Sequence, residues 1–216
     1  MRRSAKSAKA AATGGPGKGD RYHHGDLRTA LVDAAIELIG ERGVAGFSLA
    51  EASRRIGVTV AAPYRHFADR EDLLAAVAAR AAETLARSVA AESARAGEPA
   101  DRLVAAATAY IGFASARVPL FQALFAAGFD KARHPELDTA ARPILDGFLA
   151  PARALVDTGD AAERLAMAVV ATAHGHAMLL TDGAFNGAAD PVAAAVERAT
   201  TATRALVAGR SAFAEP

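Results

Sequence analysis

Apolar side chains recur along this chain mainly at intervals of three and four residues, the spacing of one face of an α-helix. The first such stripe contains Leu27, Leu31, Ala34 and Leu38. The pattern predicts helices at about residues 26–41, 49–56, 60–66, 69–96, 100–116, 119–129, 136–156, 160–182 and 190–208. The chain lacks the β-branched runs alternating with polar residues that mark half-buried strands. We therefore expect an all-α protein of about nine helices.

Capping and turn residues define the first three of these helices. Asp26 is placed to cap the first helix, and Ser48 with Glu51 fits the capping box Ser-x-x-Glu of the second. Gly57 follows the last apolar position of the second helix, where a helix commonly ends. Thr59 is placed to cap the third helix, which is short.

Glycine and proline divide the rest of the chain. Gly97-Glu98-Pro99 separates the helix at 69–96 from those that follow it, and Pro143 and Pro151 predict a kink or break within 136–156. The expected organisation is a disordered basic arm, an N-terminal three-helix unit, and a larger helical unit that starts with a connecting helix. These parts cover residues 1–20, 21–68 and 69–210, with the connecting helix at 69–96.

The second and third helices have the layout of a helix-turn-helix, in which the second helix of the pair enters the DNA major groove. The short third helix is too polar to be core. Tyr64 and His66 can contact phosphate oxygens, Thr59 and Arg65 can meet base edges or backbone, and Phe67 points inward. The candidate DNA contacts on this segment are Thr59, Val60, Ala61, Tyr64, Arg65 and His66. Short helix pairs with a glycine turn also occur in ordinary helical bundles, which is the alternative interpretation.

Charge is distributed unevenly along the chain. The net charge is only +1, but residues 1–70 hold 12 Lys and Arg against 7 Asp and Glu. The remainder is mildly acidic, so the N-terminal part is the one suited to phosphate groups. Five of the basic residues precede position 20, and these could contact DNA as a flexible arm or form an inert solvated tail.

Composition excludes several other classes of protein. The chain has no cysteine, so disulfides and thiol chemistry are not available. No apolar run reaches the roughly 18–20 residues that span a bilayer. The basic N-terminus lacks the apolar region of a secretory signal, so we expect a cytoplasmic protein with no membrane partner.

Two motifs in this sequence resemble those of TetR-type transcriptional regulators. They are Tyr22-His-His-Gly-Asp-Leu-Arg28 and Ala61-Ala-Pro-Tyr-Arg-His-Phe67, the second followed by Asp69-Arg-Glu-Asp-Leu73. Together with His174-Gly175, they are similar to the subgroup with a WHG-type C-terminal domain, although the chain contains no tryptophan. The resemblance is most specific over residues 22–80.

This resemblance implies a ligand-responsive DNA-binding protein, in most cases a repressor, that binds a palindromic operator as a homodimer. It also implies that Ser48 and the start of the helix at 69–96 contact the sugar-phosphate backbone. Arg70 stands where the family usually has lysine, which keeps the positive charge. Small-molecule release of the operator is expected, and no cofactor is implied.

An effector pocket is expected within the C-terminal helices, beneath the connecting helix in the family architecture. Aromatic and flexible apolar residues gather there, and His174 could supply one orienting hydrogen bond. The candidate lining is Phe113, Phe121, Phe125, Phe129, Phe148, Met167, His174 and Met178. The alternative is that these residues form plain core. In the absence of a charged cluster among them, we expect an apolar or aromatic effector.

A dimer interface is expected on the last two long helices, as a four-helix bundle with the partner's pair. The candidate stripe on 160–182 is Leu165, Val169, Thr172, His176 and Leu180. The candidate stripe on 190–208 is Val192, Val196, Ala199, Thr203 and Leu206. Both stripes could instead be core within one chain.

Enzymatic and metal-binding alternatives depend on two histidines. His174 and His176 stand two positions apart on a helix and point to different sides, unlike the i, i+4 pairs that share a metal. We therefore expect no metal site. An all-α enzyme with one of these histidines as general base remains an alternative, but the sequence has no nucleophile elbow or phosphate loop. A constitutive DNA-binding dimer without an effector is the third possibility.

Overall fold

The computed structural model describes residues 24–126 and 133–214, and in these residues the chain is all-α. The α-helices are α1 (His24–Arg42), α2 (Leu49–Arg55), α3 (Arg70–Arg95), α4 (Pro99–Ala116), α5 (Val118–Leu124), α6 (Pro135–Arg153), α7 (Gly159–Thr181) and α8 (Pro191–Ala208). Three short 3-10 turns are η1 (Val44–Gly46), η2 (Ala62–Arg65) and η3 (Arg210–Phe213). The small N-terminal unit contains α1, α2 and η2, and the larger helical unit follows it along the chain.

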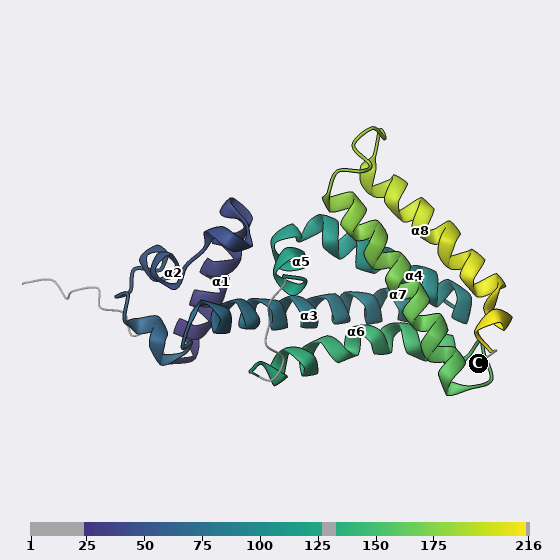
Figure 1. The fold of residues 1–216 in the computed structure, drawn as a ribbon, viewed down its shortest axis with the longest axis horizontal. Coiled ribbons are helices and arrows are strands. Elements are labelled where there is room, and N and C mark those ends of the chain that lie inside the picture. Colours follow the sequence, from purple (N-terminus) through teal and green to yellow (C-terminus); the bar gives the residue numbers. More distant parts are fainter. Residues whose placement is uncertain (1–23, 127–132, 215–216) are drawn as a thin grey trace, which may run out of the picture.

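The long helix α3 joins two groups of helices (Figure 1). Its first turns lie with α1, α2 and η2 in the small N-terminal unit, and its later turns pack against α4, α5 and α6. The helices α7 and α8 pack against α4 and against each other, away from the N-terminal unit. The core that they enclose is continuous from α1 to α8.

Close packing between α3 and α6 centres on Gly147. A Cβ atom added to this glycine would lie 2.6 Å from Cγ1 of Val89 on α3. A residue with a side chain at this position would therefore collide with Val89, and glycine lets α6 pack closely against α3. The contact fixes α6 tightly against the middle of α3.

The prediction of an α-helix at about residues 60–66 is wrong. Residues 62–65 form the 3-10 turn η2 instead of an α-helix, so the described residues contain eight α-helices and not nine. Pro63 explains the difference, because it removes a backbone donor and disfavours α-helical geometry at Ala62. The turn is nevertheless anchored, since the backbone amides of His66 and Phe67 both donate to the Pro63 carbonyl, at 2.8 and 2.9 Å.

Other helix boundaries also differ from expectation. The first helix begins at His24, two residues before Asp26, so Asp26 does not precede it as a cap. The helix α6 runs without a break through Pro143 and Pro151. Pro143 lies on the exposed side of this helix. The expected arm at 1–20 and Phe129 lie outside the described residues.

No single helix in the described ranges combines the length and the apolar character of a membrane span. Only α4 and α5 taken together, across a bend of 108°, meet those criteria by length and composition.

Candidate nucleic-acid interface and associated sites

The turn after α2 has the hydrogen bonding of a Schellman motif. The amide of Gly57 donates to Arg54 at 3.2 Å, and the amide of Val58 donates to Ser53 at 3.0 Å. Gly57 has φ of +73°, a conformation that favours glycine. The prediction that Gly57 ends the second helix is confirmed, and the turn directs the chain from α2 into η2.

Ser48 caps α2 as expected, and its hydroxyl also contacts the Glu51 side chain. The amide of Glu51 donates to the Ser48 hydroxyl at 3.2 Å, and that hydroxyl lies 3.4 Å from the Glu51 carboxylate. Thr59, by contrast, does not cap η2 through its side chain, since that turn has no side-chain cap. Ser48 is part-exposed at the start of α2, so it combines a capping role with access to a partner.

The segment around η2 has one inward and one outward face. Pro63 is buried and Phe67 is 2% exposed, so the expectation that Phe67 points inward is confirmed. On the outward face Tyr64 is 60% exposed and Val60 is 50% exposed. The remaining exposed candidates on this face are Thr59, Ala61 and Arg65.

Two side chains that we expected to contact phosphates, those of His66 and Arg70, have other orientations. His66 is part-exposed, but its Nε2 atom is buried without a hydrogen-bond partner in the described residues, so that atom does not face a phosphate. Arg70 donates from Nε to the Phe47 carbonyl at 3.1 Å and from Nη2 to the Val44 carbonyl. Its guanidinium also lies 4.5 Å from the centroid of the Phe47 ring. Arg70 therefore ties the start of α3 to the η1–α2 junction.

Ion pairs neutralise several other arginines of the N-terminal unit. Arg55 pairs with Glu41 at 2.7 Å, which lowers the pKa of that carboxyl through its hydrogen bond, and Arg42 pairs with Glu51. Arg54 and Arg65 are exposed and have no ion pair within the described residues. Arg54 is not among the expected DNA contacts. Its position in the last turn of α2, just before the glycine turn, could have indicated it from the sequence.

A charged cluster joins the first turn of α3 to the segment before α6. Asp69 caps α3 by accepting from the amide of Asp72 at 3.0 Å. Arg133 bridges Asp69 at 2.8 Å, and Glu71 and Asp72 at 3.2 Å. The hydrogen bond from Arg133 holds the pKa of Asp69 below its usual value. The buried His134 contacts Glu71 at 3.2 Å, so the two units are also connected through side chains at this point.

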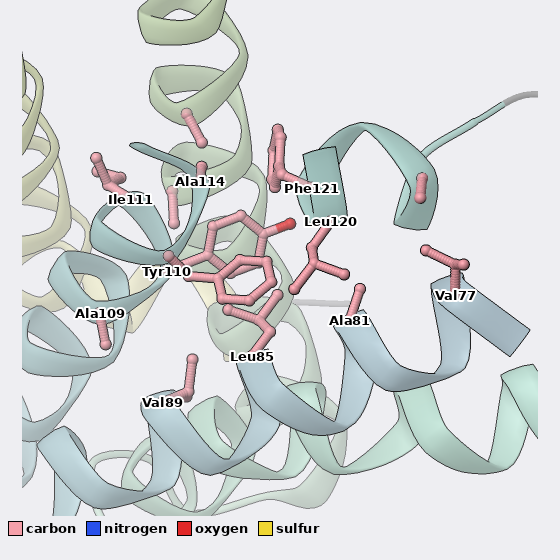
Figure 2. Packing of buried hydrophobic residues seen from close by; sticks show 14 of the residues in the cluster. Val77, Ala81, Leu85, Val89, Ala109, Tyr110, Ile111, Ala114, Leu120 and Phe121 are labelled. Atoms are coloured by element: carbon pink, nitrogen blue, oxygen red, sulfur yellow. The ribbon is translucent and has the colours of Figure 1, made fainter. Parts of the chain in front are cut away.

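Four of the expected pocket residues surround one buried tyrosine. Tyr110 lies between side chains of α3 and the α5 residues Leu120 and Phe121 (Figure 2). Its ring centroid is 6.1 to 6.5 Å from those of its aromatic neighbours, and its hydroxyl shares a 3.0 Å hydrogen bond with Nδ1 of His174. The aromatic cluster is Tyr110, Phe121, Phe125, Phe148 and His174. Tyr110 is the member that the sequence pattern does not single out, either as core or as a site residue.

The remaining pocket candidates have other positions. Phe113 is buried on α4, whereas Met167 is 53% exposed and Met178 is 37% exposed on the outer face of α7. The two methionines therefore do not line an internal pocket. Five cavities of about 270 to 600 Å³ lie on the described residues, and none of the five is lined by a member of the aromatic cluster.

Burial of His174 makes the stability of the fold depend on pH. Its pKa is lowered because desolvation disfavours the charged imidazolium. The neutral ring stabilises the fold fully above the ordinary pKa of 6.5, and this contribution is lost as pH falls through the lowered folded value.

We therefore expect the urea midpoint to decrease between pH 7.5 and pH 5, and to decrease less in His174→Gln, which does not titrate. Parallel unfolding curves at both pH values measure this difference. An equal decrease in the wild-type protein and in His174→Gln would contradict the assignment.

The expected dimer stripes are only partly on the surface. Leu165, Val169 and Thr203 are fully buried, and Ala199 is 1% exposed, so these four residues belong to the core of one chain. They face inward because α7 and α8 both pack against α4. The other candidates are at least part-exposed and are Thr172, His176, Leu180, Val192, Val196 and Leu206.

A second apolar face is exposed on α7 beside α8. Met167, Met178 and Leu179 are 53%, 37% and 48% exposed, and Val192 on α8 is 38% exposed. Ala171 lies between them on the exposed side of α7. Two apolar-lined hollows of about 580 and 450 Å³ flank Phe213 on this side. We call this surface the α7–α8 face.

His174 and His176 diverge as expected. The Nδ1 atom of His174 is bonded to Tyr110, and that of His176 lies 2.8 Å from the Thr172 carbonyl. In the described part of the chain, no three His, Cys, Asp or Glu side chains form a group able to hold a metal ion.

Comparisons with known proteins identify both parts of the chain. Residues 31–77 match the model of bacterial regulatory proteins of the tetR family. Residues 103–203 match the model of the tetracyclin repressor-like C-terminal domain. None of the curated proteins in the comparison matches the chain.

Solved structures show the same fold. A protein of unknown function from Rhodococcus sp. RHA1 is 30% identical, with a TM-score of 0.73 over 87% of this chain and 97% of that one. A transcriptional regulator of the TetR/AcrR family from Thermobifida fusca is 21% identical, with a TM-score of 0.62 over 83% and 97%. The TetR family regulator PfmR from Thermus thermophilus is 16% identical, with a TM-score of 0.60 over 82% and 97%.

Proposed function

Because the chain belongs to the TetR family of bacterial DNA-binding transcriptional regulators, which are not enzymes, we propose that it is an effector-controlled repressor. It binds a palindromic operator as a homodimer in the cytoplasm and releases the operator when a small apolar effector binds. We divide it as expected from the sequence, with DNA contacts in residues 21–68 and effector binding and dimerisation in 69–210. We also assign the C-terminal domain to the WHG type, on His174-Gly175.

The observation that carries the proposal is the exposed face of η2. A tyrosine with 60% of its surface exposed on a turn held by buried Pro63 and Phe67 is placed for a partner and not for the core. Its hydroxyl suits a phosphate oxygen, and the exposed Arg54 at the end of α2 and Arg65 within η2 supply positive charge. Ser48 and Thr59 complete the set of polar contacts. Arg70 positions the α2 junction instead of contacting phosphate.

The test is operator binding by variants of Tyr64. We expect Tyr64→Phe and Tyr64→Ala to weaken binding to every duplex by about tenfold, because a hydrogen bond to a charged phosphate is lost whatever the sequence. Fluorescence anisotropy with a selected operator and with a scrambled duplex measures both affinities. If Tyr64→Ala bound both duplexes as tightly as the wild type, η2 would not be the DNA-contacting element.

The homodimer is supported by the α7–α8 face. Contiguous exposed apolar surface of this kind marks interaction sites in soluble proteins. Two-fold pairing of this face would cover its methionine, leucine and valine side chains and fill the hollows beside Phe213. Such a dimer presents two copies of η2 to half-sites about one helical turn apart, roughly 34–36 Å.

We propose that the effector binds at the aromatic cluster. Phe125 is 43% exposed and its ring lies 4.5 Å from that of His174, so this ring is the accessible side of the cluster. The Tyr110–His174 pair supplies a single polar anchor in apolar surroundings, which suits a mainly apolar or aromatic compound. Loss of operator binding on adding such a compound distinguishes this mechanism from a constitutive DNA-binding dimer.

A further inference from the structure

The outward face of η2 combines apolar methyl groups with a small set of hydrogen-bonding groups. Among residues 59–65, the hydroxyls of Thr59 and Tyr64 and the guanidinium of Arg65 are the only polar side-chain groups. The segment contains no Asn, Gln, Asp, Glu or Lys. Asn and Gln are the residues that recognise adenine by paired hydrogen bonds, and Asp and Glu accept from cytosine. These modes of direct base recognition are therefore not available on η2.

Val60 is the most prominent apolar group on this face. It is 50% exposed, although Val is among the residue types most often buried. Its neighbour Ala61 is exposed as well, so the two form a small apolar surface at the start of the turn. The polar groups of Tyr64 and Arg65 lie after it along the chain.

One group in the major groove suits such a surface. The C5-methyl of thymine is the only apolar group that a base pair presents there, and it distinguishes A·T from T·A and from both G·C arrangements. Building on the proposed function, we propose that Val60 determines specificity by packing against a thymine C5-methyl in each half-site. The methyl contact by Val60 then adds specificity for thymine to the base hydrogen bonds that are open to Thr59 and Arg65.

The test uses duplexes selected from a random library by the full-length protein. Each thymine of a selected duplex is replaced by deoxyuridine, which lacks only the C5-methyl, at symmetric positions in both half-sites. Removal of one methyl contact is expected to lower affinity about fourfold, or roughly 15-fold for the two half-sites together. We expect this loss at one symmetric thymine pair.

The variant Val60→Ala separates this contact from other thymine effects. It is expected to bind the thymine duplex more weakly than the wild type and to bind the thymine and deoxyuridine duplexes with nearly equal affinity. Val118→Ala on α5 is the matched control, since Val118 is also exposed, at 37%, and lies in the larger unit. This control is expected to keep the full deoxyuridine effect.

Two results would overturn this inference and leave the proposed function standing. One is a selected operator whose binding to the wild type changes less than about twofold at every deoxyuridine position, well below the loss of one methyl contact. The other is a Val60→Ala variant that keeps the full deoxyuridine effect. Failure to select any specific duplex would overturn the proposed function together with this inference.

Discussion

Ala171→Glu is expected to convert the protein to a monomer and to weaken operator binding by about 100-fold or more. The substitution places a charge within the apolar α7–α8 face, where burial between two copies would leave it unpaired. A monomer engages one half-site at a time and loses the effective concentration that links the two binding events, which is worth roughly 10²- to 10⁴-fold. Sedimentation velocity and anisotropy with the selected operator measure the two effects.

The matched control is Ala91→Glu, the same change at an exposed position of α3. It is expected to leave both the sedimentation coefficient and the operator affinity unchanged. A wild-type protein that sediments as a monomer at micromolar concentration would contradict the dimer. If Ala171→Glu remained a dimer with full operator affinity, the dimer interface would lie on another surface.

Phe148→Ala is expected to have the largest effect on stability, a loss of about 3–5 kcal/mol. Phe148 has no exposed surface, and its ring centroid lies 6.5 Å from that of Tyr110. Truncation removes apolar surface that is fully buried and leaves a cavity between packed helices. Urea unfolding at a fixed protein concentration measures the loss, since dimerisation makes the midpoint depend on concentration.

Phe125→Ala is the control within the same cluster. Phe125 is 43% exposed, so the same truncation is expected to cost about 1 kcal/mol, the size of an aromatic pair contribution. If the two variants lost equal stability, burial would not explain the role of these rings.

Local signals in the sequence predict the caps and turns of the N-terminal unit well. The Ser48 cap and the glycine turn at Gly57 depend on residues within five positions of each other, so they are visible without knowledge of the fold. The α-helix expected at residues 60–66 is wrong, because Pro63 disfavours α-helical geometry even in a first turn. The orientations of the His66 and Arg70 side chains depend on residues more distant in the sequence. The spacing of apolar positions therefore does not predict them.

The C-terminal helices show a different limit. The helix α7 is apolar around most of its circumference, so its hydrophobic period does not tell which face is core. Leu165 and Val169, expected on a dimer surface, are buried, whereas Met167 and Met178, expected in a pocket, are exposed. Only the position of α4 against α7 decides between the two faces.

The length of α3 has a mechanical consequence. Its 26 residues span about 39 Å, from the DNA-contacting unit to the helices around the aromatic cluster. A tilt of about 5° about the packed end therefore moves the other end by roughly 3 Å. Hydrogen bonds of roughly 2.7–3.2 Å to phosphates and bases do not persist through a displacement of that size. In the proposed mechanism the helix would therefore work as a lever arm, in which an angular change too small to disturb the core becomes a linear shift large enough to break the contacts with DNA.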